Sequence, residues 1–403
     1  EMSASLVGSE MCIRDSFKGD HTFFCRDSGA FCKAFQRIGV ESRAIMPTPI
    51  QEGDDPDLIR TEYSNLEDSG WWKSLGIDGL VLYAWGMGKY TPVARAVHEA
   101  GIYLVVYMDT SGLFYPWRYW SVLTRHLWNM ERVRKGKWKG TAYFCLRFLR
   151  AHTIGALNTG VRKHLEMADL ITFPIPLALD SIRGNRRLYG TRLGSRVALI
   201  PTPIASHESR GSLFQKRNLV VAVGRWDDRF QKNPELLMET LEKFLNGNDD
   251  WDIDIYGTVP SFMRVWHDAL PSGQQTRIRL EGVVPNEELQ KSYAEAKICL
   301  CTSRYESSHI VSAEALCAGA SIVAPELIPM LSCAEWYISH DSGTLSPRNT
   351  PEGMVAALME EVHLWETGKR DPREISRYWK DQLLAVNSCK RILDFYEKSK
   401  HRD

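Results

Sequence analysis

Short apolar runs alternate with stretches of helical periodicity along almost the whole chain. Ten of these runs predict buried strands, five in each half of the sequence. They comprise residues 42–46, 79–84, 102–108, 169–173, 197–200, 219–223, 253–256, 278–281, 298–302 and 321–324. Strands that alternate with helices are typical of βαβ units and parallel sheets. The pattern therefore predicts an α/β protein with two doubly wound domains.

A turn-rich segment at residues 201–212 separates the two sets of strands and predicts a hinge. We expect an N-terminal domain over residues 17–205 and a C-terminal domain over residues 213–375. Residues 376–403 predict a terminal helix, which either crosses back to the N-terminal domain or is a plain end of the chain. In doubly wound sheets, ligands bind outside the carboxyl ends of the strands, so functional residues are expected in those loops.

The first sixteen residues do not fit this pattern. They lack a cationic segment followed by a long apolar core, so they do not form a signal peptide. They resemble translated adapter sequence, and we expect residues 1–16 to be non-native. On this interpretation they take no part in the fold, and the first strand of the N-terminal domain is missing or truncated.

Composition narrows the functional class. A chain of 403 residues is too long for one ordinary core, in agreement with two domains. The net charge is zero, so no overall field attracts nucleic acid. The nine cysteines show no Cys-x-x-Cys spacing, which favours reduced thiols in a cytoplasmic protein over disulfides or a zinc site. No apolar stretch of about 18 residues predicts a membrane-spanning helix.

Residues 117–150, here called the basic aromatic segment, differ from the rest. They hold nine basic residues, eight aromatic residues and a single acidic residue, Glu131. Aromatic rings beside Arg and Lys favour an interface with an anionic membrane. Packing of the rings on the N-terminal domain explains the composition equally well. Contact with single-stranded nucleic acid is a third interpretation, which the neutral chain as a whole disfavours.

The first candidate residues follow the strand at 219–223. Gly224 and Arg225 end this strand, and Lys232 precedes a helix that is expected to begin near Pro234. Arg can bind a diphosphate through its planar fork and Lys as a point charge. Both would also stabilise a departing nucleoside diphosphate. Two ordinary surface cations would have the same spacing, so this motif does not decide the function alone.

Two strand–glycine turns follow, at Gly257 and at Gly282-Val283. A glycine lets the backbone approach a flat ligand closely, so the two turns could hold a base and a ribose. Generic turns between strands and helices would look the same.

The segment from residue 298 to residue 324 is the most informative. Glu306 lies in a loop after a predicted strand, and Glu314 lies on the helix that follows. On one continuous helix their eight-residue spacing would be about 12 Å. Carboxylate pairs of glycosidases are about 5–9.5 Å apart, so glycoside hydrolysis is disfavoured. The longer spacing suits the distance from a donor sugar, near Glu306, to a ribose, near Glu314.

The start of that helix lies between the two carboxylates. The first N–H groups of a helix have no intrahelical partner and attract anions. The amides at this position belong to Ser308, His309 and Ile310. The segment can therefore hold a phosphate flanked by two carboxylates, which suits a nucleotide-sugar.

Taken together, these motifs resemble glycosyltransferase family 4. The ordered set is Gly224-Arg225…Lys232, Gly257, Gly282-Val283 and Ser303-x-Tyr305-Glu306-x₇-Glu314-Ala-Leu-x-Ala-Gly319. The resemblance covers residues 219–324 closely and the preceding residues loosely. It implies the GT-B fold, in which two Rossmann-like domains face each other across a cleft. It also implies a retaining, metal-independent transfer by front-face displacement, with a nucleoside-diphosphate sugar as co-substrate and no cofactor.

The resemblance assigns roles to individual residues. Arg225 and Lys232 would bind the donor diphosphate, Glu306 the donor sugar and Glu314 the ribose. The family often has a glycine-containing stretch where this chain has Ser307-Ser308-His309, so His309 either crowds the phosphates or donates a hydrogen bond to them.

The N-terminal half departs further from the family. Asp109 stands about where many members have a histidine near the reacting sugar. It would orient a hydroxyl there, although a helix N-cap or turn role fits as well. A weaker candidate on the acceptor side is Asp27-Ser28-Gly29, before the first helix.

Two further patterns are interpreted as structural. Asp252-x-Asp254 matches the metal signature of the other large glycosyltransferase fold, but its place at the start of a strand predicts that the carboxylates meet solvent or a helix. Cys299 and Cys301 alternate within a buried strand and predict packing.

We therefore expect a cytoplasmic retaining glycosyltransferase that moves a hexose-type sugar to a glycan or lipid-linked acceptor. A peripheral position on the inner face of the membrane would follow from the basic aromatic segment. A nucleotide-sugar epimerase or hydrolase on the same fold is the alternative enzyme. A non-catalytic module that binds sugar-nucleotides or nucleic acid is the alternative from another class.

Overall fold

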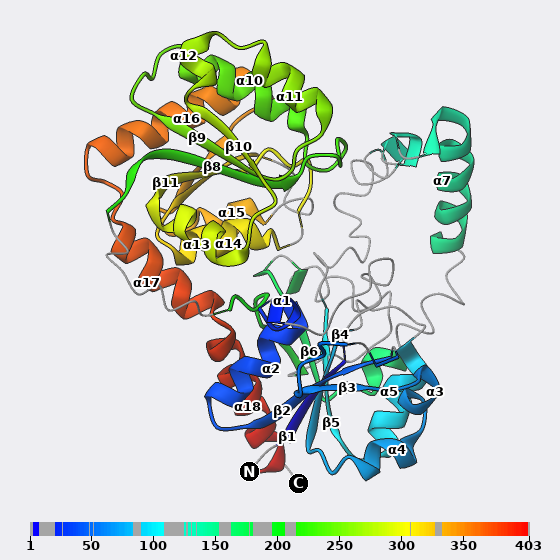
Figure 1. The fold of residues 1–403 in the computed structure, drawn as a ribbon. Helices are drawn as coiled ribbons and strands as arrows, with labels where there is room; N and C mark the ends of the chain where they lie inside the picture. Colours follow the sequence, from blue (N-terminus) through cyan, green and yellow to red (C-terminus); the bar gives the residue numbers. More distant parts are fainter. Residues whose placement is uncertain are drawn as a thin grey trace. The chain divides into compact units, whose positions relative to one another are not determined.

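The structure is a computed structural model that divides into two compact units. The first comprises Glu1–Ser206 with Leu384–Asp403, and the second comprises His207–Leu383. Each unit holds a parallel sheet with helices on its faces (Figure 1). The described residues are 3–7, 21–25, 27–47, 49–50, 52–83, 90–108, 125, 128–129, 131–133, 135–152, 163–176, 178–179, 196–205, 215–306, 308–326 and 333–401.

The sheet of the first unit has seven strands in the order β3-β2-β1-β4-β5-β6-β7, and all pair in parallel. The strands are β1 (Ser3–Val7), β2 (Glu41–Met46), β3 (Leu58–Arg60), β4 (Gly79–Tyr83), β5 (Tyr103–Tyr107), β6 (Leu170–Phe173) and β7 (Val197–Leu199). All five residues of β4 are buried, as expected where helices cover both faces of a parallel sheet. The five strands predicted in this half are confirmed.

The expectation that a first strand is missing is wrong. Ser3–Val7 forms β1 between β2 and β4, where Ala4 pairs with both Ser42 and Gly79. Without β1 the backbone groups along the inner edges of β2 and β4 would lack partners, which is costly inside a sheet. The run from Ser3 to Val7 is short and largely apolar, which suits that place. That residues 1–16 are non-native stays a prediction.

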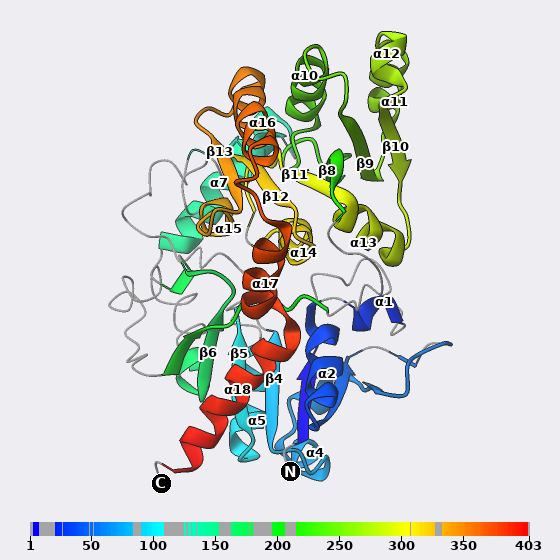
Figure 2. The ribbon, with the colours of Figure 1, turned by 90° about the vertical axis from the view of Figure 1, so that its left-hand side faces the viewer.

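The helices of the first unit are α1 (His21–Phe24), α2 (Asp27–Arg37), α3 (Tyr63–Leu66), α4 (Ser69–Ser74), α5 (Thr91–Glu99), α7 (Lys137–His152) and α18 (Ala385–Lys400). α18 lies beside α2, although the two are far apart in the sequence (Figure 2). Phe31 of α2 and Cys389 and Ile392 of α18 belong to one buried apolar cluster. Residues from the end of the chain therefore complete the core of this unit.

The end of the chain forms two helices, α17 (Pro372–Leu383) and α18, and not the single terminal helix that the sequence predicts. α17 belongs to the second unit, which therefore extends beyond the predicted boundary at residue 375. Trp379 of α17 is fully buried, and its Nε1 donates to Ser342 Oγ at 2.9 Å. Leu384 is extended and separates α17 from α18. The anchoring of Trp379 explains why the boundary lies later than predicted.

The sheet of the second unit has six parallel strands in the order β10-β9-β8-β11-β12-β13. The strands are β8 (Arg217–Arg225), β9 (Asp252–Thr258), β10 (Ile278–Gly282), β11 (Ala296–Leu300), β12 (Ser321–Pro325) and β13 (Gly343–Ser346). The remaining helices are α10 (Pro234–Leu245), α11 (Ser261–Asp268), α12 (Ser272–Gln275), α13 (Asn286–Glu295), α14 (Ile310–Cys317), α15 (Ala334–Tyr337) and α16 (Pro351–Glu366). All five strands predicted here are confirmed.

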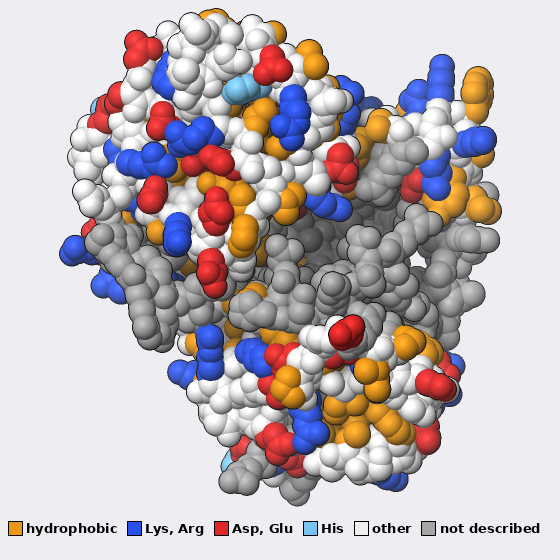
Figure 3. All heavy atoms as spheres, viewed as in Figure 1, with side chains coloured by type: hydrophobic (Ala, Val, Ile, Leu, Met, Phe, Trp, Pro, Cys, Tyr) orange, Lys and Arg blue, Asp and Glu red, His pale blue; other side chains and the backbone are white. Residues whose placement is uncertain are grey.

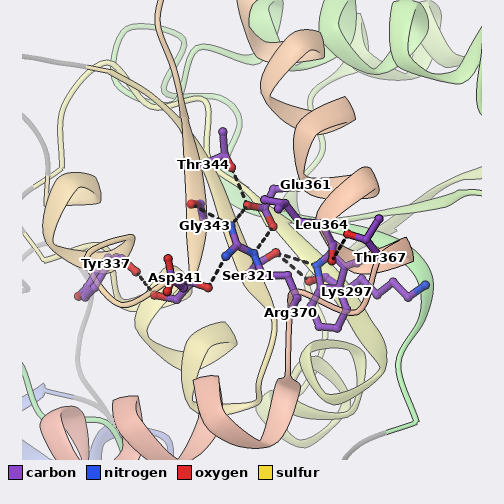
Figure 4. A network of polar contacts seen from close by, with 12 residues as sticks. Lys297, Ser321, Tyr337, Asp341, Gly343, Thr344, Glu361, Leu364, Thr367 and Arg370 are labelled. Carbon is purple, nitrogen blue, oxygen red and sulfur yellow. Dashed lines mark hydrogen bonds and ion pairs between the residues drawn. The ribbon is translucent and has the colours of Figure 1, made fainter.

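A buried ion pair joins α16 to the segment that follows it, and both partners also bond to β13 (Figure 4). Glu361 is fully buried and accepts two bonds from Arg370, from Nη2 at 2.5 Å and from Nε at 3.0 Å. Thr344 Oγ1 of β13 donates to the same carboxylate at 2.6 Å. Arg370 also donates to the carbonyls of Asp341 and Gly343, so every group of the network has a polar partner.

Within the described part of the chain, the longest helices lack the length and apolar character needed to cross a membrane.

Candidate functional site

The candidate site lies where the strand order of the second sheet reverses. β8 and β11 are neighbours in this sheet, and the chain leaves them in opposite directions along it. The loops that follow their carboxyl ends are joined by hydrogen bonds. Arg304 N donates to Gln231 O at 2.8 Å, and Thr302 Oγ1 donates to Lys232 O at 2.9 Å. This is the position at which doubly wound sheets bind their ligands.

Lys232 and Glu306 meet at this position, one from each loop. Lys232 Nζ donates to Glu306 Oε1 at 2.5 Å, and only 12% and 10% of the two side chains are exposed. Burial by itself would raise the pKa of Glu306, but the neighbouring His309 and Lys232 outweigh it and lower the pKa. Glu306 is therefore a carboxylate at neutral pH. The sequence assigned each residue to a ligand and did not predict that they pair with each other.

His309 is the third ionisable group at this position. Its Nε2 lies 3.9 Å from Glu306 Oε1, and its Nδ1 lies 2.5 Å from Ser312 Oγ. The residue is buried at the start of α14. Burial by itself would lower the pKa of His309, but Cys301 and Glu306 outweigh it and raise the pKa. The two distances show that the imidazole lies between Glu306 and Ser312.

The thiol of Cys301 is also part of this cluster. Burial by itself would raise the pKa of Cys301, but the adjacent His309 outweighs it and lowers the pKa. Cys301 is the first residue after β11, so its side chain reaches the loop, whereas Cys299 is packed within the strand. The interpretation of both cysteines as packing is correct for Cys299 and incomplete for Cys301.

Arg225 and the two glycines beside it lie at the ends of β8 and β9. Arg225 is exposed, and its carbonyl accepts from Asp228 N at 3.0 Å. Gly224 pairs with Gly257, which has a φ of 105°. A Cβ added at Gly257 would overlap the carbonyl oxygen of Gly224, and one added at Gly224 would lie 3.1 Å from the ring of Trp226. Close packing of the two strand ends thus requires Gly257, whereas Gly224 makes room for the ring of Trp226. Contact of either glycine with a ligand stays a prediction.

The remaining donor-side residues of the second unit lie on neighbouring loops and on α14. Val283 is 78% exposed after the turn at Gly282, which has a φ of 76°. Ser308 is buried, and its carbonyl accepts from Tyr337 Oη at 2.5 Å, which ties the loop to α15. Ile310 begins α14, and Glu314 lies partly buried on the same helix. Glu306 precedes the helix, so the two glutamates do not share a continuous helix.

The candidates of the first unit are described only in part. Asp109 lies outside the described residues. Asp27 and Ser28 open α2, but their side chains also lie outside the described part. A Cβ at Gly29 would overlap the carbonyl of Phe23, so Gly29 is required for α1 to pack on α2.

The prediction that Asp252 and Asp254 meet solvent or a helix is wrong for Asp254, whose side chain is buried, and holds in part for Asp252, whose side chain is 37% exposed. Asp254 Oδ1 accepts from Arg279 Nε at 2.6 Å, and Asp252 Oδ2 accepts from Arg279 Nη1 at 3.3 Å. Arg217 of β8 lies 3.6 Å from Asp252. The three strands run side by side in register, so arginines on β8 and β10 reach the carboxylates of β9. Among the described residues no group of three or more His, Cys, Asp or Glu could hold a metal ion.

The comparisons with known proteins agree with this architecture. Residues 217–362 match the family model described as glycosyl transferases group 1. No curated protein sequence matches the chain. Three solved structures illustrate the likeness of the fold, which is the GT-B fold.

The first is the lipopolysaccharide outer core galactosyltransferase WaaB, with a TM-score of 0.62 and 13% identity over 99% of this chain and 100% of that one. The second, from Listeria monocytogenes, is described as a UDP-N-acetylglucosamine 2-epimerase and gives a TM-score of 0.60 and 10% identity over 100% and 98%. The third is Anabaena Alr3699/HepE in complex with UDP and glucose, with a TM-score of 0.52 and 12% identity over 98% and 100%.

Proposed function

We propose that the protein is a retaining glycosyltransferase, because residues 217–362 match the family model of glycosyl transferases group 1 and the chain has the GT-B fold. It moves a sugar from a nucleoside-diphosphate donor to a glycan or lipid-linked acceptor, without a metal ion. The observation that carries this proposal is the meeting of Lys232 and Glu306 at the carboxyl ends of β8 and β11.

The donor would lie along the edge of the second sheet. Its diphosphate competes with Glu306 for Lys232 and recruits the exposed Arg225 and the amides around the start of α14, those of Ser308 and His309 before the helix and that of Ile310, its first residue. Glu306 then accepts bonds from hydroxyls of the donor sugar. Glu314 accepts bonds from the ribose.

The reaction follows from these positions. The bond between the anomeric carbon and the diphosphate oxygen breaks, and the acceptor oxygen bonds to the same face of that carbon. The acceptor proton passes to the departing diphosphate. The positive charges of Lys232 and Arg225 stabilise the negative charge that develops on the diphosphate.

Two of the similar proteins support a nucleotide-sugar donor and a glycan acceptor. WaaB is described as a galactosyltransferase of the lipopolysaccharide outer core, and the Anabaena protein was solved with UDP and glucose. Base, sugar and linkage differ among such proteins, so the donor is best identified by a panel of ligands.

A thermal-shift screen with ADP, GDP, UDP, dTDP and their sugars tests the proposal. A ligand at a hundred times its dissociation constant should stabilise the protein by about 2.7 kcal/mol. Lys232→Ala and Arg225→Ala should weaken the binding of the active ligand by at least about tenfold each, because each removes a charge-assisted contact. Arg229→Ala is the matched control, since Arg229 lies in the same loop but pairs with Glu235.

Two results would refute the proposal. One is that no nucleoside diphosphate or its sugar stabilises the protein. The other is that Lys232→Ala and Glu306→Gln transfer sugar as fast as the unchanged protein.

We also propose that the basic aromatic segment holds the protein against the inner, anionic face of a membrane. Its described part contains α7, where basic and hydrophobic side chains gather at the surface (Figure 3). Trp138 is 82% exposed, and Lys137 lies over its ring at 5.9 Å. Exposed rings beside cations are suited to the interface between lipid headgroups and acyl chains.

Co-sedimentation with vesicles tests this contact. The protein should bind vesicles that contain phosphatidylserine and should not bind neutral ones, since each cation adds about 1 kcal/mol only at an anionic surface. Trp138→Glu should reduce binding, whereas Val265→Glu, at an exposed position of the second unit, should not. If the two variants bind the vesicles equally well, the proposed membrane contact is refuted.

An epimerase or hydrolase on the same fold is the second candidate, because the Listeria protein is as similar in fold as WaaB. Such an enzyme would form product from the nucleotide-sugar without an added acceptor. Incubation of the donor alone, followed by chromatography, distinguishes the two.

A further inference from the structure

The ion pair between Lys232 and Glu306 raises a question about donor binding. Lys232 Nζ donates to Glu306 Oε1 at 2.5 Å, so a diphosphate that draws the ammonium group toward itself competes with this carboxylate. If Lys232 leaves, a carboxylate that is only 10% exposed loses its closest counter-charge. A buried charge without a partner is strongly unfavourable, so this loss would oppose binding.

A second basic group lies beside the same oxygen atom. His309 Nε2 lies 3.9 Å from Glu306 Oε1. Ser312 Oγ fixes the other ring nitrogen at 2.5 Å, so the imidazole is held in this orientation. The loop is held as well, since Tyr337 Oη donates to Ser308 O at 2.5 Å.

The backbone of His309 gives independent evidence. Its φ of 27° and ψ of 73° lie in a left-handed region that glycine adopts freely and that other residues disfavour. Such strain persists where the surrounding structure requires it, often at functional sites. A histidine at a position that suits glycine indicates that its side chain contributes something that offsets the strain.

We propose that His309 is a positioning residue for Glu306, which it keeps charged and in place when Lys232 moves to the donor diphosphate. In the free protein Glu306 has two cations beside it, Lys232 and His309. In the complex Lys232 binds the diphosphate, and His309 alone balances the carboxylate that receives the sugar. This inference rests on the proposed function and deepens it, because it assigns His309 to the carboxylate and not only to the phosphates.

The proposal predicts that donor binding depends on pH. The groups that face His309 are Cys301 from the end of β11, Glu306 from the same loop, Lys232 from the loop after β8 and Ser312 from α14. When the imidazole loses its proton, Glu306 retains Lys232, and the diphosphate loses a cation. Affinity for the nucleoside diphosphate should therefore fall as pH rises through the titration of His309.

A double-mutant cycle tests the proposal. The probe is whichever of ADP, GDP, UDP and dTDP binds the unchanged protein, and its dissociation constant is measured by calorimetry. His309→Asn should weaken binding by at least about tenfold, the ratio that corresponds to about 1.4 kcal/mol. Asparagine tolerates the left-handed backbone, so the fold should be kept. Glu306→Gln should not weaken binding, because it releases Lys232.

The double variant decides between the roles of His309. If His309 acts through Glu306, His309→Asn combined with Glu306→Gln binds as tightly as Glu306→Gln alone. If the double variant is as weak as His309→Asn, the histidine contacts the phosphates directly and the proposal is overturned. Unchanged binding by His309→Asn would also overturn it.

Further measurements guard against misfolding and separate the two proposals. His309→Gly, which removes the imidazole and the backbone strain together, should bind the probe as weakly as His309→Asn and should lose the part of the pH dependence that His309 contributes. The probe's own terminal phosphate titrates in every variant, so a pH dependence in either variant equal to that of the unchanged protein would overturn the proposal. If none of the four probes binds the unchanged protein, the proposed function itself fails.

Discussion

Replacement of Arg370 by alanine tests how the second unit keeps a charge in its core. Glu361 is fully buried, and both of its oxygens accept from Arg370, at 2.5 and 3.0 Å. Arg370→Ala leaves only the hydroxyl of Thr344 on this carboxylate. Removal of one partner of a buried ion pair typically costs about 3–5 kcal/mol. The carbonyls of Asp341 and Gly343 also lose their donors, so we expect a loss toward the upper end of that range.

Urea unfolding of the full chain, followed by tryptophan fluorescence, measures this loss. Trp365 and Trp379 are buried in the second unit and report on it. Because a two-unit chain need not unfold in one step, the midpoint and slope are compared for the transition of the second unit. Arg377→Ala is the matched control. Arg377 pairs with Glu374 on the surface, where 80% and 65% of the side chains are exposed, and its removal should change stability by no more than about 0.5 kcal/mol.

A third variant separates the ion pair from simple packing. Glu361→Leu combined with Arg370→Leu removes both charges, and it should be more stable than Arg370→Ala. If Arg370→Ala unfolds within about 1 kcal/mol of the unchanged protein, the reasoning from an uncompensated buried charge is wrong.

Three further predictions concern the candidate site. Gly257→Ala should destabilise by at least about 1–3 kcal/mol and weaken donor binding, because a Cβ there overlaps Gly224 and the φ is positive. Thermal unfolding checks it, with Gly247→Ala, where a Cβ meets nothing within 4 Å, as the control that should stay unchanged. The folded pKa of His309 is raised above its ordinary 6.5, so its stabilising contribution is full below that pH and is lost as pH rises through the raised value. The unchanged protein should therefore melt at a higher temperature than His309→Asn, and this difference in melting temperature should be larger in acid than in alkali. A difference that grows as pH rises would contradict the raised pKa of His309. A chelator such as EDTA should leave donor binding and sugar transfer unchanged, and loss of either would show that a metal takes part.

The fold was predictable because buried parallel strands are continuous apolar runs. Most of the predicted strands share this property, as β4 illustrates with every residue buried, whereas β2 and β10 were recognised from alternating apolar residues. The strands that were missed lack it. β3 has only three residues, all partly exposed, and β13 begins with a glycine and is largely half-buried. β1 was missed for another reason, since its segment resembled adapter sequence and was left out.

The site was predictable in its location and only partly in its contacts. Lys232 and Glu306 follow strands that the doubly wound topology makes neighbours, so their proximity follows from order along the chain. Their mutual ion pair, and the approach of His309, depend on the left-handed turn before α14, which sequence periodicity does not encode. The pairing of Asp254 with Arg279 likewise depends on strand register.

The return of α18 to the first unit has a consequence for how the protein is made. Residues 207–383 are complete before α18 is synthesised, so the second unit can finish folding while the nascent first unit still lacks a helix. Until then the apolar side chains around Phe31 have no cover from Cys389 and Ile392. A chain that ends after residue 383 would therefore have a complete second unit and a first unit with an exposed apolar cluster, which would make it a natural substrate for chaperones.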